Sequence, residues 1–122
     1  MERHDPPIPT DGDPVLAARA RVLHDLGARG MADVVGVSIL EDAVSQRRWW
    51  LSQWADGAPF IAGLIAQDVA DALFDRVGRW PRCTACEQNA EHSLHIEPEL
   101  GDDPHWVCAE SGMTVAPLGA LR

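Results

Sequence analysis

The chain has 122 residues, 46% of them apolar and 24% charged, a composition that excludes wholesale disorder and fits one domain with at most a small appendage. Nineteen acidic residues outnumber ten basic ones, for a formal net charge of −9, which disfavours a nucleic-acid-binding protein that relies on a broad basic surface. All ten basic residues are arginines, so chemistry that depends on lysine is excluded.

Residues 1–13 are predicted to form a flexible lead-in, because Pro6, Pro7 and Pro9 lie there among charged residues. This segment lacks the apolar core of a secretory signal, and no stretch of the chain approaches eighteen consecutive apolar residues. Three cysteines do not make a fully paired disulfide framework. We therefore expect a cytoplasmic protein that does not associate with a membrane.

Two helices are predicted from apolar residues that recur at helical spacing. The first covers residues 14–28, where Asp13 can cap the N-terminus and Pro14 can take the first helical position. The second covers residues 60–76 and is followed by Gly78, a typical C-terminal stop signal.

Residues 33–54 combine signals for strands with signals for a helix. Valine and isoleucine alternate with smaller residues at the start of this stretch, and the tryptophans near its end favour pleated surfaces. These features predict a β-hairpin. The alternative is a helix through residues 39–54, in which Trp50 and Trp54 lie one turn apart on the same face.

The chain changes character at residue 80, where cysteines, histidines and turn residues replace the helical pattern. Two short strands are predicted at 106–108 and 113–116, with a tight turn between them. Trp80 and Trp106 are expected to seal the joint with the preceding helix. The predicted fold is therefore α+β: two helices with a short hairpin over residues 14–79, followed by a small C-terminal module over residues 80–122.

The C-terminal module carries the pattern of a metal site. Cys83 and Cys86 have the C-x2-C spacing that lets two thiolates converge on one ion, and Cys108 follows downstream. Structural zinc prefers four tetrahedral nitrogen or sulfur ligands, and three cysteines with one histidine are a common set. We predict a structural Zn²⁺ bound by the three cysteines, with His92 or His95 as the fourth ligand.

The segment from Cys108 to Gly112 looks like a second cysteine knuckle in which Ser111 replaces the second cysteine. On these residues the stretch 80–120 resembles a zinc ribbon, a β-hairpin fold built on two such knuckles. The pattern W-x-C-x-x-x-G-x-x-V-A, which begins at Trp106, is also similar to the C-termini of small uncharacterised actinobacterial proteins, and the GC-rich codon usage suggests an actinobacterium or its phage. The resemblance implies a structural zinc and brings no known activity.

Three other interpretations of the cysteines are open. They can be buried apolar residues, or a redox pair, although no βαβ pattern precedes them. The third is a catalytic zinc, because His95-Ile96-Glu97 beside the cysteine pair echoes the motif pieces of zinc deaminases in reversed order. A catalytic site needs an open metal position and a general base within reach, so the structural role is preferred.

A cluster of aromatic and basic residues lies at Arg47, Arg48, Trp49, Trp50 and Trp54. Tryptophans usually pack in cores and at junctions between elements. Exposed together, they would form a patch that anchors a partner protein. Stacking on nucleic-acid bases is a further possibility that the acidic composition disfavours.

These features favour a non-enzymatic, zinc-stabilised adaptor or assembly protein that binds another protein. The second hypothesis is a nucleic-acid-associated zinc-ribbon regulator that uses Arg47 and Arg48, although the net charge disfavours nucleic acid as a partner. A small metalloenzyme is the third.

Overall fold

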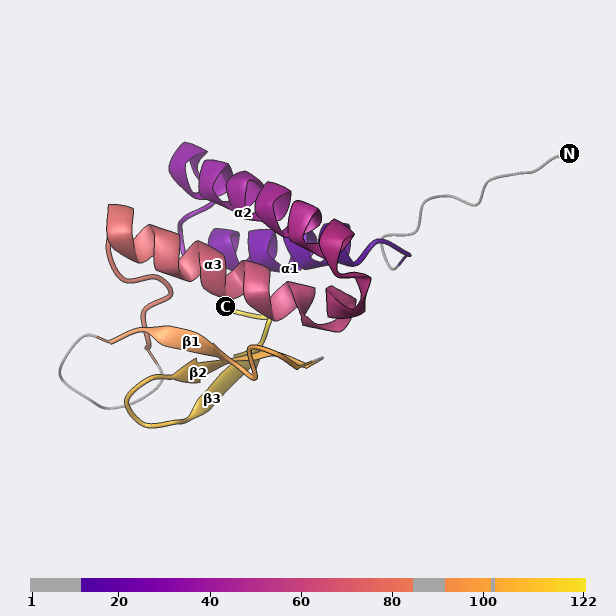
Figure 1. The fold of residues 1–122 in the computed structure, drawn as a ribbon. Coiled ribbons are helices and arrows are strands. Elements are labelled where there is room, and N and C mark those ends of the chain that lie inside the picture. The colour runs from indigo at the N-terminus through magenta and orange to yellow at the C-terminus, as the bar shows by residue number, and fades with distance from the viewer. Residues whose placement is uncertain (1–11, 85–91, 102) are drawn as a thin grey trace, which may run out of the picture.

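The computed structural model describes residues 12–84, 92–101 and 103–122. It confirms the predicted α+β class, with a layer of helices packed against a three-stranded antiparallel sheet (Figure 1). The elements, in chain order, are α1 (Pro14–Ala28), α2 (Val34–Gln53), the 3-10 helix η2 (Ala55–Phe60), α3 (Ile61–Arg76), β1 (Leu94–Glu97), β2 (His105–Cys108) and β3 (Thr114–Pro117).

Helix α1 begins as the sequence predicts. The Oδ1 atom of Asp13 accepts hydrogen bonds from the backbone N–H groups of Val15 at 2.9 Å and Leu16 at 3.2 Å, and Pro14 occupies the first turn. These bonds satisfy two of the donors that every helix N-terminus leaves without an intrahelical acceptor.

The hairpin predicted over residues 33–54 is wrong, because this stretch forms helix α2. Asp33 caps the helix by accepting a hydrogen bond of 2.9 Å from the N–H of Gly36. Individual valines and tryptophans favour strands, but packing decides the outcome: the buried residues recur at helical spacing and face α1 and α3. They are Gly36, Ile39, Leu40, Ala43 and Val44.

Helix α3 lies at the centre of the fold and confirms the predicted second helix. It packs against α1 and α2 on one side and against β1 on the other. Backbone N–H groups of Val77 and Gly78 both donate to the carbonyl of Leu73, which closes the helix at the predicted glycine. The stretch Ala55–Arg76 is long and apolar enough to cross a membrane, with a mean hydropathy of 1.2, but α3 buries seven residues in the protein core.

The sheet has the order β1-β2-β3, and both pairings are antiparallel. Strands β2 and β3 confirm the two strands that the sequence predicts, whereas β1 was not predicted. The register pairs Leu94 with Cys108 and Glu97 with His105. This C-terminal β-region is compatible with a zinc-ribbon-like module.

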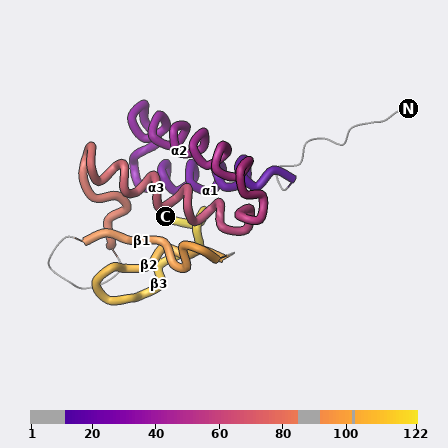
Figure 2. Tube along the Cα trace, in the orientation of Figure 1, coloured from indigo at the N-terminus to yellow at the C-terminus, as the bar shows by residue number. Residues whose placement is uncertain are grey.

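The C-terminal residues return from β3 to the helical layer (Figure 2). The Nε of Arg21 donates to the carbonyl of Leu118 at 3.2 Å, and the Nε2 of His24 is 3.1 Å from the carbonyl oxygen of Leu121. Both leucines are buried in the core. The tail is therefore part of the packed structure.

Trp80 and Trp106 seal the joint between helices and sheet, as predicted. Both are buried, and their rings meet edge to face with centroids 5.6 Å apart, an arrangement that aromatic pairs favour. One continuous hydrophobic core includes residues from all three α-helices and the sheet, so it extends across the predicted boundary at residue 80.

Candidate metal centre

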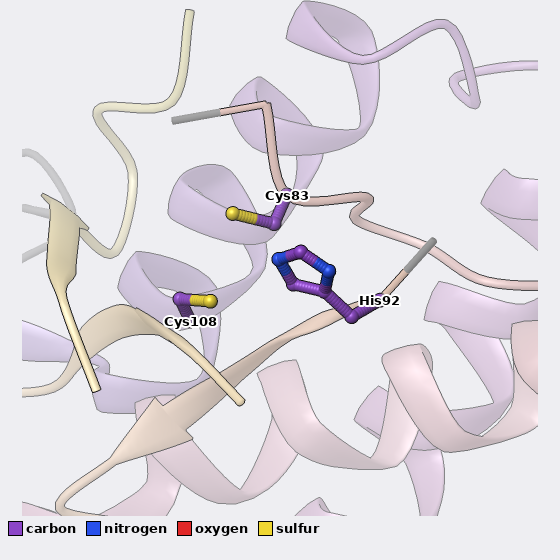
Figure 3. Close-up of side chains that lie close together, drawn as sticks. All are labelled: Cys83, His92 and Cys108. Carbon is purple, nitrogen blue, oxygen red and sulfur yellow. The ribbon is translucent and has the colours of Figure 1, made fainter. Parts of the chain in front are cut away.

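Three side chains with metal-binding atoms converge at one end of the sheet. The sulfurs of Cys83 and Cys108 and a ring nitrogen of His92 all lie within 4.8 Å of one another. They come from the segment after α3, the segment before β1 and the end of β2, and they face a common space (Figure 3).

Backbone pairing brings the first two of these segments together. The N–H of Cys83 donates to the carbonyl of His92 at 3.0 Å, and the N–H of Leu94 donates to the carbonyl of Pro81 at 2.8 Å. In turn Leu94 is paired with Cys108 in the β1–β2 register. Residues separated by up to 25 positions thereby meet through ordinary antiparallel hydrogen bonding.

Cys108 is the last residue of β2, at the start of the tight turn to β3. Its backbone N–H donates to the carbonyl of Met113 at 2.8 Å, and its carbonyl accepts from the N–H of Gly112 at 2.9 Å. Gly112 has a φ of 76°, which a residue without a side chain adopts readily. The N–H of Ser111 points to the Cys108 sulfur at 3.3 Å, so the knuckle-like geometry persists although serine replaces the second cysteine.

The surroundings of Cys108 favour its thiolate. Burial raises the pKa of this thiol, but hydrogen bonds from the Ser111 side chain, the backbone N–H groups of Ser111 and Glu110, and the Cys83 side chain outweigh it and lower the pKa from 9.0 to about 6. The thiolate is the form of cysteine that binds metals.

The donor set fits a metal ion of borderline softness. In a tetrahedral zinc site with bonds of about 2.3 Å to sulfur, ligand sulfurs lie about 3.8 Å apart, and the three donor atoms here lie within 4.8 Å of one another. Cys83, His92 and Cys108 therefore lie close enough to bind a metal ion together.

The other predicted ligands have different placements. Cys86 lies outside the residues that the structure describes. His95 is on β1, and its Nε2 is 2.6 Å from a carboxylate oxygen of Glu97 rather than beside the cysteines. His105 on β2 was not a predicted ligand, and its ring Nδ1 is 2.9 Å from the carbonyl oxygen of Asp103.

The predicted partner-binding residues lie on and just beyond the C-terminal half of α2. Trp49 is 67% exposed and Trp54 46% exposed, whereas Trp50 is half-buried. Arg47 forms a two-point ion pair with Asp68 of α3, at 2.6 and 3.0 Å, and its guanidinium lies 5.3 Å from the centre of the Trp50 ring.

A shallow hollow of about 600 Å³ opens beside these residues. It is lined by Arg47, Trp49, Trp50, Ser45 and Gln46. The second predicted arginine, Arg48, points to Asp13 at 3.5 Å.

A second hollow, which was not predicted from the sequence, lies beside the residues that flank Cys83. Arg29, Arg79 and Arg82 line a cleft of about 370 Å³ together with Trp80 and Thr84. Arg79 and Arg82 are close to Cys83 in the sequence and could have drawn attention to it. Arg29 comes from the end of α1, and no local pattern connects it with the other two.

Fold and site together define a small α+β protein with a cysteine–histidine centre that can hold a metal ion. The chain belongs to the family described as a domain of unknown function, DUF8819, which matches residues 11–118. No curated protein matches the chain, and neither does any solved structure.

Proposed function

We propose that this protein is a non-enzymatic cytoplasmic adaptor or assembly protein, whose C-terminal module is a zinc-ribbon-like unit stabilised by Zn²⁺. The convergence of Cys83, His92 and Cys108 carries the proposal. Two thiols and an imidazole are ligands that zinc prefers, and His92 and Cys108 are both buried.

Cys86 is the proposed fourth ligand. It follows Cys83 at the C-x2-C spacing that places two thiolates on one ion. With Cys108 and His92 it would complete a Cys3His shell. A shell of four protein ligands leaves no position for a substrate or a reactive water, which is the arrangement of structural zinc.

The proposed role of the metal is to fasten three chain segments to one another. It would join the segment after α3 to the segment before β1 and to the end of β2. Metal binding to such a site contributes directly to the free energy of folding. A catalytic role would use the His95–Glu97 pair, and these residues are not among the clustered donors.

The proposed partner surface is the exposed aromatic residues Trp49 and Trp54. Large exposed aromatics are typical anchors of protein–protein interfaces, and the hollow beside Trp49 and Trp50 offers space for a partner side chain. Arg47 and Arg48 are engaged by Asp68 and Asp13. Their charges are therefore partly neutralised, which favours a protein partner over a phosphate backbone.

Metal content and interaction can be tested separately. Protein purified without added zinc should contain close to one zinc per chain by inductively coupled plasma mass spectrometry, and Cys108→Ser should lose it. Metal-free, folded, reduced protein would refute the zinc centre.

For the interaction, proximity labelling in the native host should recover a partner with the wild-type protein that Trp49→Ala/Trp54→Ala no longer labels. Phe74→Ala is the matched control, because Phe74 is an exposed aromatic residue on α3. Equal labelling by all three proteins would contradict the proposed surface.

A further inference from the structure

The arginine cleft is formed where the end of α1 meets the segment after α3. Three of the ten arginines in the chain, Arg29, Arg79 and Arg82, line this cleft of about 370 Å³. No carboxylate lines it in the described part of the chain. In a protein of net charge −9 this is a local concentration of positive charge.

Other arginines of the protein are neutralised by acidic partners. Arg19 pairs with Glu41, and Arg47 pairs with Asp68. By contrast, the side chain of Arg79 forms no hydrogen bond or ion pair with any residue in the described ranges, and it is exposed. Its charge is available to a ligand.

Arg29 is held in place by the backbone. Its Nε donates to the carbonyl of Arg122 at 2.7 Å, and its Nη1 donates to the carbonyl of Arg82 at 2.7 Å. Two backbone oxygens fix the orientation of the guanidinium and leave its remaining N–H donors. A guanidinium fixed in advance loses less conformational entropy when it binds an anion.

Trp80 supplies a second, independent indication of a ligand. This residue is 4% exposed and lines the cleft, and its indole Nε1 is buried with no hydrogen-bond acceptor among the described residues. It also borders a smaller hollow of about 210 Å³ between α3 and β1. Buried indole N–H groups normally have an acceptor, and an oxyanion is a strong one.

We propose that this cleft binds a single phosphate-type oxyanion, with Arg79 and Arg29 as the charged ligands and the hydroxyl of Thr84 as a neutral donor. Arginine is the preferred side chain for phosphate because its planar N–H groups match two phosphate oxygens at once. Met31 and Val77 complete the lining and give an apolar wall for the group that carries the phosphate.

A compact phosphate fits the surface better than a nucleic-acid strand. Binding of a strand requires several phosphates to be neutralised along a basic track, whereas the positive charge here is concentrated in one cleft of an acidic protein. The inference does not depend on zinc or on the aromatic surface, although Arg82 and Thr84 flank the metal-site residue Cys83 in the chain.

The test is a titration of the full-length ¹⁵N-labelled protein, as purified, with inorganic phosphate at constant ionic strength. The Arg79 Nε–H and Trp80 Nε1–H resonances should shift together and saturate, while the indole resonances of Trp49 and Trp54 stay in place. Arg79→Gln should weaken binding by about tenfold, the order expected for loss of one charge-assisted hydrogen bond.

Arg76→Gln is the matched control, because Arg76 is an exposed arginine of α3 that lines a different hollow. Unchanged spectra outside the mutated site would show that both variants are folded. The proposal is overturned if phosphate leaves the Arg79 and Trp80 resonances unmoved, or if the two variants weaken binding equally. It is also overturned if a single-stranded oligonucleotide binds the cleft more tightly than phosphate, with a salt dependence of several phosphate contacts.

Discussion

The indole Nε1 of Trp106 donates a hydrogen bond of 2.7 Å to the carboxylate of Asp25 and so joins β2 to α1 in the protein interior. Asp25 is completely buried. The same carboxylate accepts hydrogen bonds from the backbone N–H groups of Gly119 at 2.7 Å and Leu121 at 3.0 Å. One side chain therefore fixes the sheet and the C-terminal segment to the first helix.

Replacing this carboxylate should destabilise the whole fold. Asp25→Ala leaves two buried donors and one partly buried donor without an acceptor and should lower the free energy of unfolding by about 3 kcal/mol or more. Asp25→Asn retains one acceptor oxygen and should lower the free energy of unfolding by a smaller amount. Urea unfolding followed by tryptophan fluorescence measures both values. An Asp25→Ala protein as stable as wild type would contradict the anchoring role of this residue.

The two candidate histidines should differ in their effect on metal binding. His92→Gln removes the imidazole beside Cys83 and Cys108 and should sharply reduce the zinc retained after dialysis. His95 contacts Glu97 and not the cysteines, so the His95→Gln variant should retain zinc at the wild-type level. Metal analysis of the two variants, purified in parallel, distinguishes them, and the reverse result would assign the ligand role to His95.

Two glycine-to-alanine substitutions in helices should have opposite effects on the stability of the protein. A Cβ atom on Gly36 would overlap the carbonyl oxygen of Met31, whereas a Cβ on Gly27 would meet only the Cβ of Ala32 at 3.9 Å. Alanine is favoured over glycine in a helix by about 1 kcal/mol. Thermal unfolding should show that Gly27→Ala raises the melting temperature and that Gly36→Ala lowers it, because backbone overlap outweighs the helix preference.

The cap of α1 should make a pH-dependent contribution to stability. Partial burial raises the pKa of the Asp13 carboxyl, but hydrogen bonds from the N–H groups of Leu16 and Val15 and the charge of Arg48 outweigh it and hold the pKa below 3.8. A carboxyl with a lowered pKa in the folded state stabilises the protein above its unfolded-state value. That stability is lost as the pH falls through the folded-state pKa.

Asp13→Ala should therefore lower the free energy of unfolding by about 1 kcal/mol at neutral pH, which is the usual contribution of an N-cap. The difference from wild type should shrink once the pH falls below 3.8, the ordinary pKa of the carboxyl. Denaturant unfolding at neutral and acidic pH gives both differences. A constant difference across this range would mean that the charge of Asp13 has no part in the cap.

Local signals sufficed to predict helices α1 and α3. Asp13 and Pro14 mark the start of α1, and Gly78 marks the end of α3, because caps and stop residues act through neighbouring backbone groups. The stretch that became α2 carries competing signals. Its tryptophans and valines favour strands, and only its packing against α1 and α3 selects the helix.

Part of the metal centre could also be predicted from the sequence. The chemistry of cysteine and histidine and the spacing of Cys83, Cys86 and Cys108 indicated which residues could bind an ion. His92 lies before β1 and His95 lies on it, and choosing between them required the tertiary pairing that sets which segment lies beside Cys108.

By itself the sequence determined the α+β class, two of the helices, the C-terminal strands and the identity of the candidate ligands, since these depend on side-chain chemistry and on residues close together in the chain. The tertiary structure alone decided the helical state of α2, the placement of His92 beside the cysteines and the meeting of Arg29 with Arg79 and Arg82. Each of these depends on contacts between residues far apart in the chain, which local propensity does not encode.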